Sequence, residues 1–240
     1  MTQRSAQARR AELIALYHEL AEGHVCPLAA TRTKVVFGTG HPDADLMFVG
    51  EAPGAHEDRQ GKPFVGPAGK LLDRLLAGID LDREDTFIAN VLKCRPPGNR
   101  DPVPEEIEEC EPYLLRQIDL IEPRVICTLG NFATKLLSGS PQGITKVHGR
   151  PQICRLGRRA VRLYPLFHPA AALRTEAVLS LLRQDFERLP GLLAEPPPAI
   201  AGEPNASAPA SDPDGGGRIA SSGRQVDSQL SPAEQLDLFS

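Results

Sequence analysis

Polar side chains that could do chemistry stand directly after short apolar segments of the chain. Glu51 follows the segment LMFVG, and the loop after it carries Glu57 and the aromatic ring of Phe64. A carboxylate in such a place can activate water or stabilise a cation, and an aromatic ring can stack on a planar ligand. On these residues alone, a solvated acidic loop anchored by Phe64 explains the pattern about as well as a functional site does.

Two further polar residues, Asn90 and His168, follow later apolar segments. An amide offers a donor and an acceptor to one edge of a nucleobase, and an imidazole can donate a hydrogen bond to a developing anion. Both could instead be ordinary turn residues, since Asn is common at strand ends and His168 precedes a proline. Three basic residues after Asn90 are candidates for contacts with phosphate groups: Lys93, Arg95 and Arg100.

The elements that must position these residues alternate in type along the chain. Apolar runs predict strands at 46–50, 86–90, 124–130, 152–156 and 160–167. Apolar residues at helical spacing predict helices at 8–22, 67–78, 104–121, 131–139 and 176–189. We therefore predict an α/β fold, a three-layer α/β/α sandwich around a central, mainly parallel four-stranded sheet. Ligands bind at the carboxyl ends of such strands, which is where the loops named above would meet.

Composition divides the 240 residues into two parts. We expect residues 1–190 to form one domain and residues 191–240, rich in Pro, Ala, Gly and Ser, to be a disordered tail. The tail has seven acidic and two basic side chains, so its net charge is −5. Because the whole chain has a net charge of −4, the domain carries +1. A nearly neutral domain neither requires nor excludes DNA as a partner.

No apolar run approaches the roughly 20 residues that span a membrane, and charges interrupt the apolar residues of the N-terminal segment. We therefore expect a cytoplasmic protein that does not contact membranes, and we expect it to be a monomer. In a reducing cytosol, its five cysteines would be buried thiols or metal ligands rather than disulfides.

Three motifs together resemble the family 4 uracil-DNA glycosylases, the iron–sulfur members of the uracil-DNA glycosylase superfamily. They are GEAPG with the following E-D-x-x-G-x-P-F-V-G-x-A-G, then N-x-x-K-C-R-P-P-x-N-R, then H-P-A-x-x-L-R. The resemblance covers about residues 23–190. It implies a monofunctional enzyme that hydrolyses the N-glycosidic bond of deoxyuridine in DNA and releases uracil in base excision repair.

The resemblance also implies roles for single residues. Phe64 would stack on the flipped uracil, Asn90 would bind its N3 and O4 edge, and His168 would donate to O2. The pocket floor would comprise Gly50, Glu51 and Ala52, with Glu57 as a further acid. Better-known uracil glycosylases have Asp where this chain has Ala52, so either Glu51 or Glu57 would activate water. Expected DNA contacts are Lys93, Arg95, Arg100 and Arg174.

Family 4 enzymes hold a [4Fe–4S] cluster with four cysteines, of which this chain has three: Cys26, Cys94 and Cys110. Gly23 stands at the place of the first family cysteine, so the fourth ligand is open, and His24 is the nearest alternative. Cys127 and Cys154 lie in apolar segments, and we interpret them as core thiols.

Two other functions remain compatible with the sequence. One is a related glycosylase that prefers another deaminated base. The other is a protein that binds uracil in DNA without turnover.

The tail ends in a short apolar motif: Gln235, Leu236, Asp237, Leu238 and Phe239. It resembles the Q-L-[SD]-L-F motif with which bacterial replication and repair proteins bind the β sliding clamp. We therefore expect the clamp as a second partner besides uracil-containing DNA.

Overall fold

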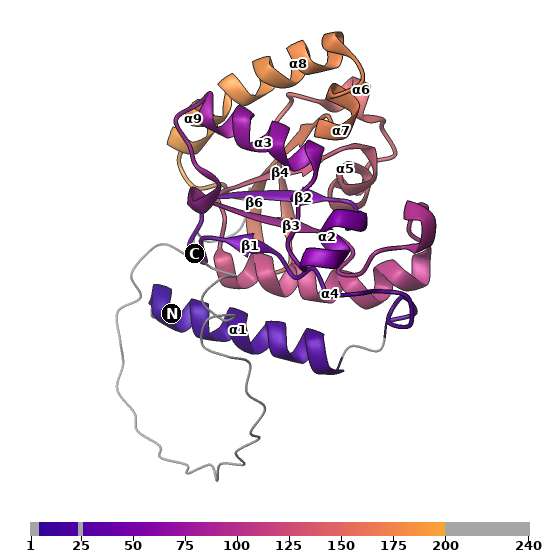
Figure 1. Cartoon of the computed structure of the whole chain (residues 1–240). Helices are drawn as coiled ribbons and strands as arrows, with labels where there is room; N and C mark the ends of the chain where they lie inside the picture. Colours follow the sequence, from indigo (N-terminus) through magenta and orange to yellow (C-terminus); the bar gives the residue numbers. More distant parts are fainter. Residues whose placement is uncertain (1–4, 24–25, 200–240) are drawn as a thin grey trace, which may run out of the picture.

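The computed structural model describes residues 5–23 and 26–199 (Figure 1). Its strands are β1 (Thr39–Gly40), β2 (Leu46–Gly50), β3 (Thr86–Asn90), β4 (Val125–Leu129), β5 (Gln152–Leu156) and β6 (Arg159–Leu166). Its α-helices are α1 (Ala6–Gly23), α2 (Ala55–Gln60), α3 (Pro67–Ala77), α4 (Pro104–Ile121), α5 (Asn131–Ser138), α6 (Ile144–Val147), α7 (Pro169–Ala172), α8 (Glu176–Glu187) and α9 (Leu189–Ala194). Two 3-10 turns, η1 (Arg83–Asp85) and η2 (Pro97–Asn99), flank β3.

The strands form one sheet in the order β1-β3-β2-β4-β6-β5. The four inner strands, β3, β2, β4 and β6, are parallel, which confirms the predicted parallel centre. The sheet has six strands rather than four, because β1 and β5 pair antiparallel with its two outer parallel strands. β1 has only two residues, too few for a sequence pattern to show.

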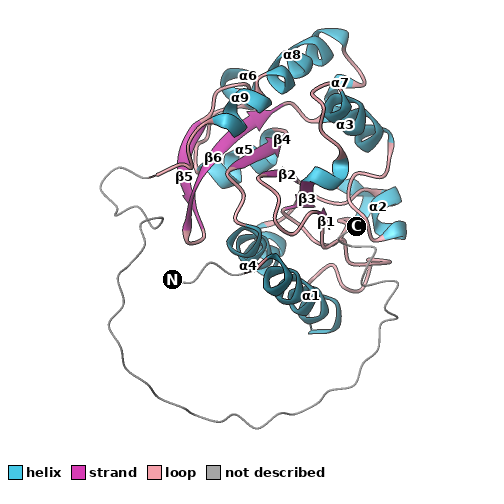
Figure 2. Ribbon diagram, turned by 90° about the vertical axis from the view of Figure 1, so that its left-hand side faces the viewer, coloured by secondary structure: helices cyan, strands magenta, loops and turns pink. Residues whose placement is uncertain are grey.

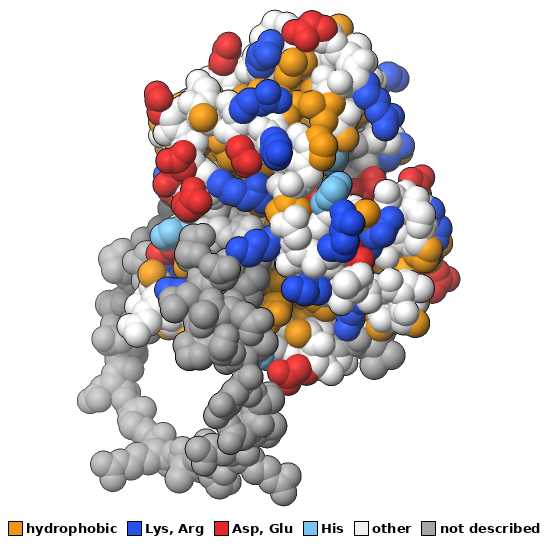
Figure 3. All heavy atoms as spheres, in the orientation of Figure 1, with side chains coloured by type: hydrophobic (Ala, Val, Ile, Leu, Met, Phe, Trp, Pro, Cys, Tyr) orange, Lys and Arg blue, Asp and Glu red, His pale blue; other side chains and the backbone are white. Residues whose placement is uncertain are grey.

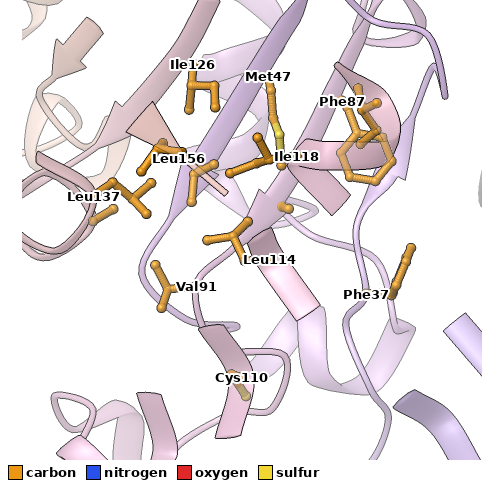
Figure 4. Packing of buried hydrophobic residues seen from close by; sticks show 14 of the residues in the cluster. Phe37, Met47, Phe87, Val91, Cys110, Leu114, Ile118, Ile126, Leu137 and Leu156 are labelled. Atoms are coloured by element: carbon orange, nitrogen blue, oxygen red, sulfur yellow. The ribbon is translucent and has the colours of Figure 1, made fainter. Parts of the chain in front are cut away.

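Helices cover both faces of the sheet, as the three-layer prediction requires (Figures 1 and 2). Successive strand residues point to opposite faces, so each strand contributes to two apolar cores. Helices α1, α4 and α5 pack on one face and form the first core with it. Figure 4 shows Met47 and Ile126 of the sheet beside Leu114 and Ile118 of α4 in this core. Helices α3, α8 and α9 pack on the other face and form the second core, where Phe48 of β2 stacks on Phe186 of α8 with ring centroids 5.8 Å apart.

The strand register aligns the ends of the inner strands. Gly50 of β2 lies directly opposite Asn90 of β3, and Leu129 of β4 lies opposite Leu166 of β6. The chain therefore leaves all four parallel strands at one edge of the sheet, and the loops that follow are brought together there.

The packed domain extends past the predicted boundary at residue 190. Helix α9 crosses that position, and Leu192 is buried against the second core. In sequence, a helical turn that contains Pro and Gly resembles the start of a linker, whereas here it packs on the domain. The predicted clamp-binding motif lies outside the described residues. No helix in the described ranges is both long and apolar enough to cross a membrane.

Candidate active site

A cavity of about 630 Å³ opens at the carboxyl ends of the parallel strands. Residues from the loops after β2, β3, β4 and β6 line it, as the sequence predicted for this edge of the sheet. The lining residues are Glu51, Asp101, Ile107, Leu129, Gly130, Asn131, Phe132, Lys135, Leu136 and His168. The cavity thus combines an apolar wall with two carboxylates, one imidazole and one ammonium group.

His168 is held as a neutral hydrogen-bond donor. It caps the N-terminus of α7, where its Nδ1 accepts a hydrogen bond from the N–H of Ala170 at 3.0 Å. Burial lowers the pKa of His168 to about 4, with a smaller opposing effect from Glu57. A neutral ring that accepts at Nδ1 carries its proton on Nε2, so Nε2–H is the available donor at neutral pH.

Phe64, Asn90 and Gly50 lie in contact beside His168. The Phe64 and His168 rings are stacked, with centroids 5.7 Å apart. A Cβ atom on Gly50 would lie 2.4 Å from Asn90 Oδ1 and 2.8 Å from Phe64 Cζ, so only glycine lets these two side chains approach. The structure therefore brings together an aromatic ring, an amide and an imidazole from three separate loops.

Glu51 is the half-buried carboxylate of the cavity. Burial raises the pKa of Glu51, and the negative charge of Asp101 raises it further. Asp101 is a cavity residue that was not among the predicted site residues. Its position directly after Arg100, in the loop that follows Asn90, was the available signal.

Glu57 lies behind the Phe64 loop. Its Oε1 accepts hydrogen bonds from the backbone N–H groups of Val65 and Gly66, both at 3.1 Å. Like Gly50, Phe64 and Asn90, Glu57 is absent from the residues that line the cavity. The two backbone hydrogen bonds show that its carboxylate helps to shape the Phe64 loop. Ala52 is half-buried and packs against the first apolar core.

Lys93 is not a surface residue, which corrects its predicted role in binding phosphate groups. Its side chain is fully buried, and Nζ donates to the carbonyl oxygens of Phe37 and Asn90 and to Oε1 of Gln117. Burial lowers the pKa of Lys93 to about 7. The contact with Asn90 O, at 2.9 Å, makes Lys93 an internal support of the loop that follows β3.

The three arginines predicted to contact DNA are more exposed than Lys93. Arg174 is exposed, and Arg95 is half-buried with Nε donating to Asn99. Arg100 is exposed but forms a two-point ion pair with the carboxylate of Glu106, at 2.9 and 2.5 Å. On the face of the molecule that Figure 3 shows, Lys and Arg side chains are more frequent than Asp and Glu in the right-hand part.

Three cysteines from distant segments converge within the core that α1 and α4 form on one face of the sheet. Cys26, Cys94 and Cys110 are all buried, and hydrogen bonding to the Cys26 thiol together with burial raises the pKa of the other two. Each sulfur also accepts an N–H hydrogen bond, from Leu28, Arg32 and Lys93 respectively, at 3.2 to 3.4 Å. In the described ranges no set of three or more His, Cys, Asp or Glu side chains is arranged to hold a single metal ion.

The two remaining cysteines belong to strands. Cys127 of β4 is fully buried in the second core, and Cys154 of β5 is half-buried against the first. Both positions agree with the interpretation as core thiols. His24 lies outside the described residues.

Residues 37–188 match the sequence profile of the Uracil DNA glycosylase superfamily. The chain is 46% identical over 176 residues to the type-4 uracil-DNA glycosylase of Sulfurisphaera tokodaii, which covers 71% of this chain and 80% of that protein. It is 42% identical over 190 residues to the type-4 enzyme of Archaeoglobus fulgidus, with 77% and 95% covered. The type-4 enzyme of Thermotoga maritima is 45% identical over 166 residues, with 68% and 85% covered. The chain therefore belongs to the uracil-DNA glycosylase superfamily and, within it, to the type-4 uracil-DNA glycosylases.

Proposed function

We propose that this protein is a monofunctional uracil-DNA glycosylase, which hydrolyses the bond between uracil and deoxyribose and leaves an abasic site. The observation that supports this best is the contact of Phe64, Asn90 and His168 around Gly50. A ring to stack on, an amide to bind one base edge and a neutral donor for an oxygen are what a flipped uracil requires. The type-4 relatives named above bear the same activity in their names.

The chemistry separates charge, and the site has a partner for each charge. Negative charge grows on the departing uracil, where Nε2–H of His168 would donate to O2. Positive charge grows on the sugar, where the Glu51 carboxylate would stabilise it or orient the attacking water. Glu51 is favoured over Glu57 for this role because it lines the cavity, whereas Glu57 binds two backbone N–H groups.

A panel of oligonucleotides distinguishes this function from the two alternatives. The protein is incubated with strands that contain uracil, hypoxanthine or only normal bases, and alkali then breaks the backbone at abasic sites. Breaks at uracil alone support the proposal. Breaks at hypoxanthine but not uracil would favour a glycosylase for another deaminated base, and tight binding of uracil DNA without breaks would favour a binding protein.

The variant Asp101→Asn is expected to extend excision toward lower pH. Glu51 acts in its ionised form, and Asp101 raises the pKa of that carboxyl. Without the neighbouring negative charge, Glu51 stays ionised at lower pH, so the acidic limb of the rate profile moves down. Single-turnover rates between pH 4.5 and 8 measure this limb. An unchanged limb, with the exposed Asp80→Asn as matched control, would contradict the coupling of these two carboxyls.

We further propose that Cys26, Cys94 and Cys110 bind an iron–sulfur cluster of the [4Fe–4S] type. Three buried sulfurs that each accept an N–H hydrogen bond form a suitable thiolate set, because such bonds stabilise the charge of cluster ligands. When bound, the cluster would cross-link the segment after α1, the loop after β3 and helix α4. Base excision requires no electron transfer, so its role here would be structural.

The variant Cys94→Ala is expected to lose iron and visible absorbance and to lower the melting temperature. Iron and sulfide analysis of anaerobically purified protein measures the first effect, with Cys154→Ala as a matched control outside the cysteine set. Gly23→Cys is expected to raise the iron content, because it supplies a thiolate at the place of the first family cysteine. A side chain fits at this position, since a Cβ on Gly23 would meet open space. A stable, fully active Cys94→Ala protein without iron would contradict a structural cluster.

We also propose that the C-terminal motif at 235–239 recruits the enzyme to the β sliding clamp, at the nucleoid in the cytoplasm. Its Leu and Phe side chains suit a small apolar pocket, and the entropy cost of ordering would fall on only a few residues. Titration of the clamp with a peptide of residues 230–240 should show binding that is lost when Leu238 and Phe239 are both changed to Ala. Equal binding of both peptides, or of neither, would show that the resemblance is accidental.

A further inference from the structure

The backbone of Phe64 adopts a conformation that a side chain disfavours. Its φ of 52° lies in the left-handed region, which residues other than glycine rarely occupy. The start of α3 lies close to this backbone: a Cβ on Gly69 would be only 1.6 Å from the Phe64 carbonyl oxygen, so the approach requires glycine there. Such a conformation persists only where surrounding groups hold it, and these positions gather at functional sites.

One of the holding groups is Arg83, which comes from η1 and lies 19 residues further along the chain. Its guanidinium donates to the carbonyl oxygen of Phe64, at 3.1 Å, and to that of Pro63. The same group forms an ion pair with Asp73 of α3, at 3.0 Å. Arg83 thus binds two consecutive carbonyls of the Phe64 loop and the helix that follows it.

Glu57 holds the same loop from the other direction, through the N–H groups of Val65 and Gly66. The peptide groups before and after Phe64 are therefore both bound by charged side chains. The ring that results is 5% exposed and lies against Gly50 and His168. Its position depends on the backbone that these charged groups fix.

We propose that Arg83 is a positioning residue for base recognition: it sets the Phe64 ring at the height and tilt needed to stack on the flipped base. This rests on the proposed function, in which Phe64 is the stacking ring. The task requires a planar fork of donors that reaches two carbonyls and a carboxylate together, which the single ammonium group of lysine cannot reproduce. The prediction is therefore specific to arginine and not to positive charge.

A double-mutant cycle separates positioning from a general effect on the fold. Single-turnover excision is measured for the unchanged protein, Arg83→Gln, Phe64→Ala and the double variant. Arg83→Gln is expected to slow excision about ten- to a hundredfold, as misplacement by about 1 Å does elsewhere. In the Phe64→Ala background the same change should matter less than about twofold, since no ring remains to position.

Two further variants serve as controls for charge and for the loss of an arginine elsewhere on the surface. Arg83→Lys keeps the charge beside Asp73 and should fold, but it should show the same loss as Arg83→Gln. Arg183→Gln, at an exposed arginine that pairs with Glu176, should leave the rate unchanged.

Three outcomes would overturn the proposal, and they differ in what else they affect. A normal rate in Arg83→Gln, or an equal loss in both backgrounds, overturns the positioning role alone. A normal rate in Phe64→Ala overturns the role of the ring as well. Absence of excision by the unchanged protein overturns the proposed function itself.

Discussion

Replacing His168 by alanine is expected to slow uracil excision by about 10²–10³-fold, the usual loss when one preorganised donor to a developing anion is removed. The affinity for uracil-containing DNA should change little, because the hydrogen bond to O2 strengthens mainly in the transition state. Single-turnover rates and a binding titration on the same duplex measure the two quantities.

The protonation state of His168 adds a second expectation. Because the pKa of its ring is lowered to about 4, the ring is neutral throughout the working range. The His168-dependent part of the rate should therefore show no inflection near pH 6.5, where an ordinary histidine titrates. His18→Ala, at a half-buried histidine of α1 whose ring contacts Glu22, is the matched control. An unchanged rate in His168→Ala would remove this residue from the mechanism.

The variant Asn90→Asp is expected to lower the preference for uracil over cytosine by at least about tenfold. In the proposed function the amide of Asn90 would offer an N–H donor to O4 of uracil, whereas a carboxylate oxygen in its place would repel O4 and accept from the amino group of cytosine. The measurement is the ratio of kcat/KM for oligonucleotides that differ only in the target base.

Asn90 is almost fully buried, so water cannot easily screen the charge of a carboxylate at this position. Gln152→Glu, on the exposed edge strand β5, provides the same change from amide to carboxyl away from the cavity. If Asn90→Asp selects uracil over cytosine as well as the unchanged protein does, another group reads that edge of the base.

The sequence was sufficient to locate the loops of the site but not to assign every residue in them. Parallel strands were predictable from apolar runs that end in Gly50 or Asn90, and parallel strands necessarily bring their carboxyl ends to one edge. The meeting of Phe64, Asn90 and His168 follows from that topology. The short edge strand β1 and the helices α2, α6 and α7 were missed because they have too few residues to show a period.

Lys93 shows where local patterns mislead. A lysine in a motif beside two arginines suggests a phosphate contact, whereas this one is buried among carbonyl oxygens. Its neighbours Val91, Leu92 and Cys94 are all apolar and buried, which was the signal for an interior position. Its acceptors on Phe37 and Gln117 lie 56 and 24 residues away in the chain, so no local pattern could have identified them.

The different surroundings of Glu51 and Glu57 also depend on tertiary contacts. Both are acids in one loop, and sequence spacing treats them alike. In the fold, one faces the cavity beside Asp101 and the other binds the backbone next to Phe64. Arg83 was overlooked for the same reason, since its bonds to the Phe64 loop cross 19 and 20 residues of chain.

Quantifying free uracil tests the proposed activity most directly. The protein is incubated with a duplex that contains one uracil, and the released base is measured by chromatography while the backbone is examined before and after alkali. We predict one free uracil for each abasic site, with an intact backbone until alkali is added. Tight binding of the duplex with no free uracil, or strand cleavage without alkali, would contradict a monofunctional uracil-DNA glycosylase.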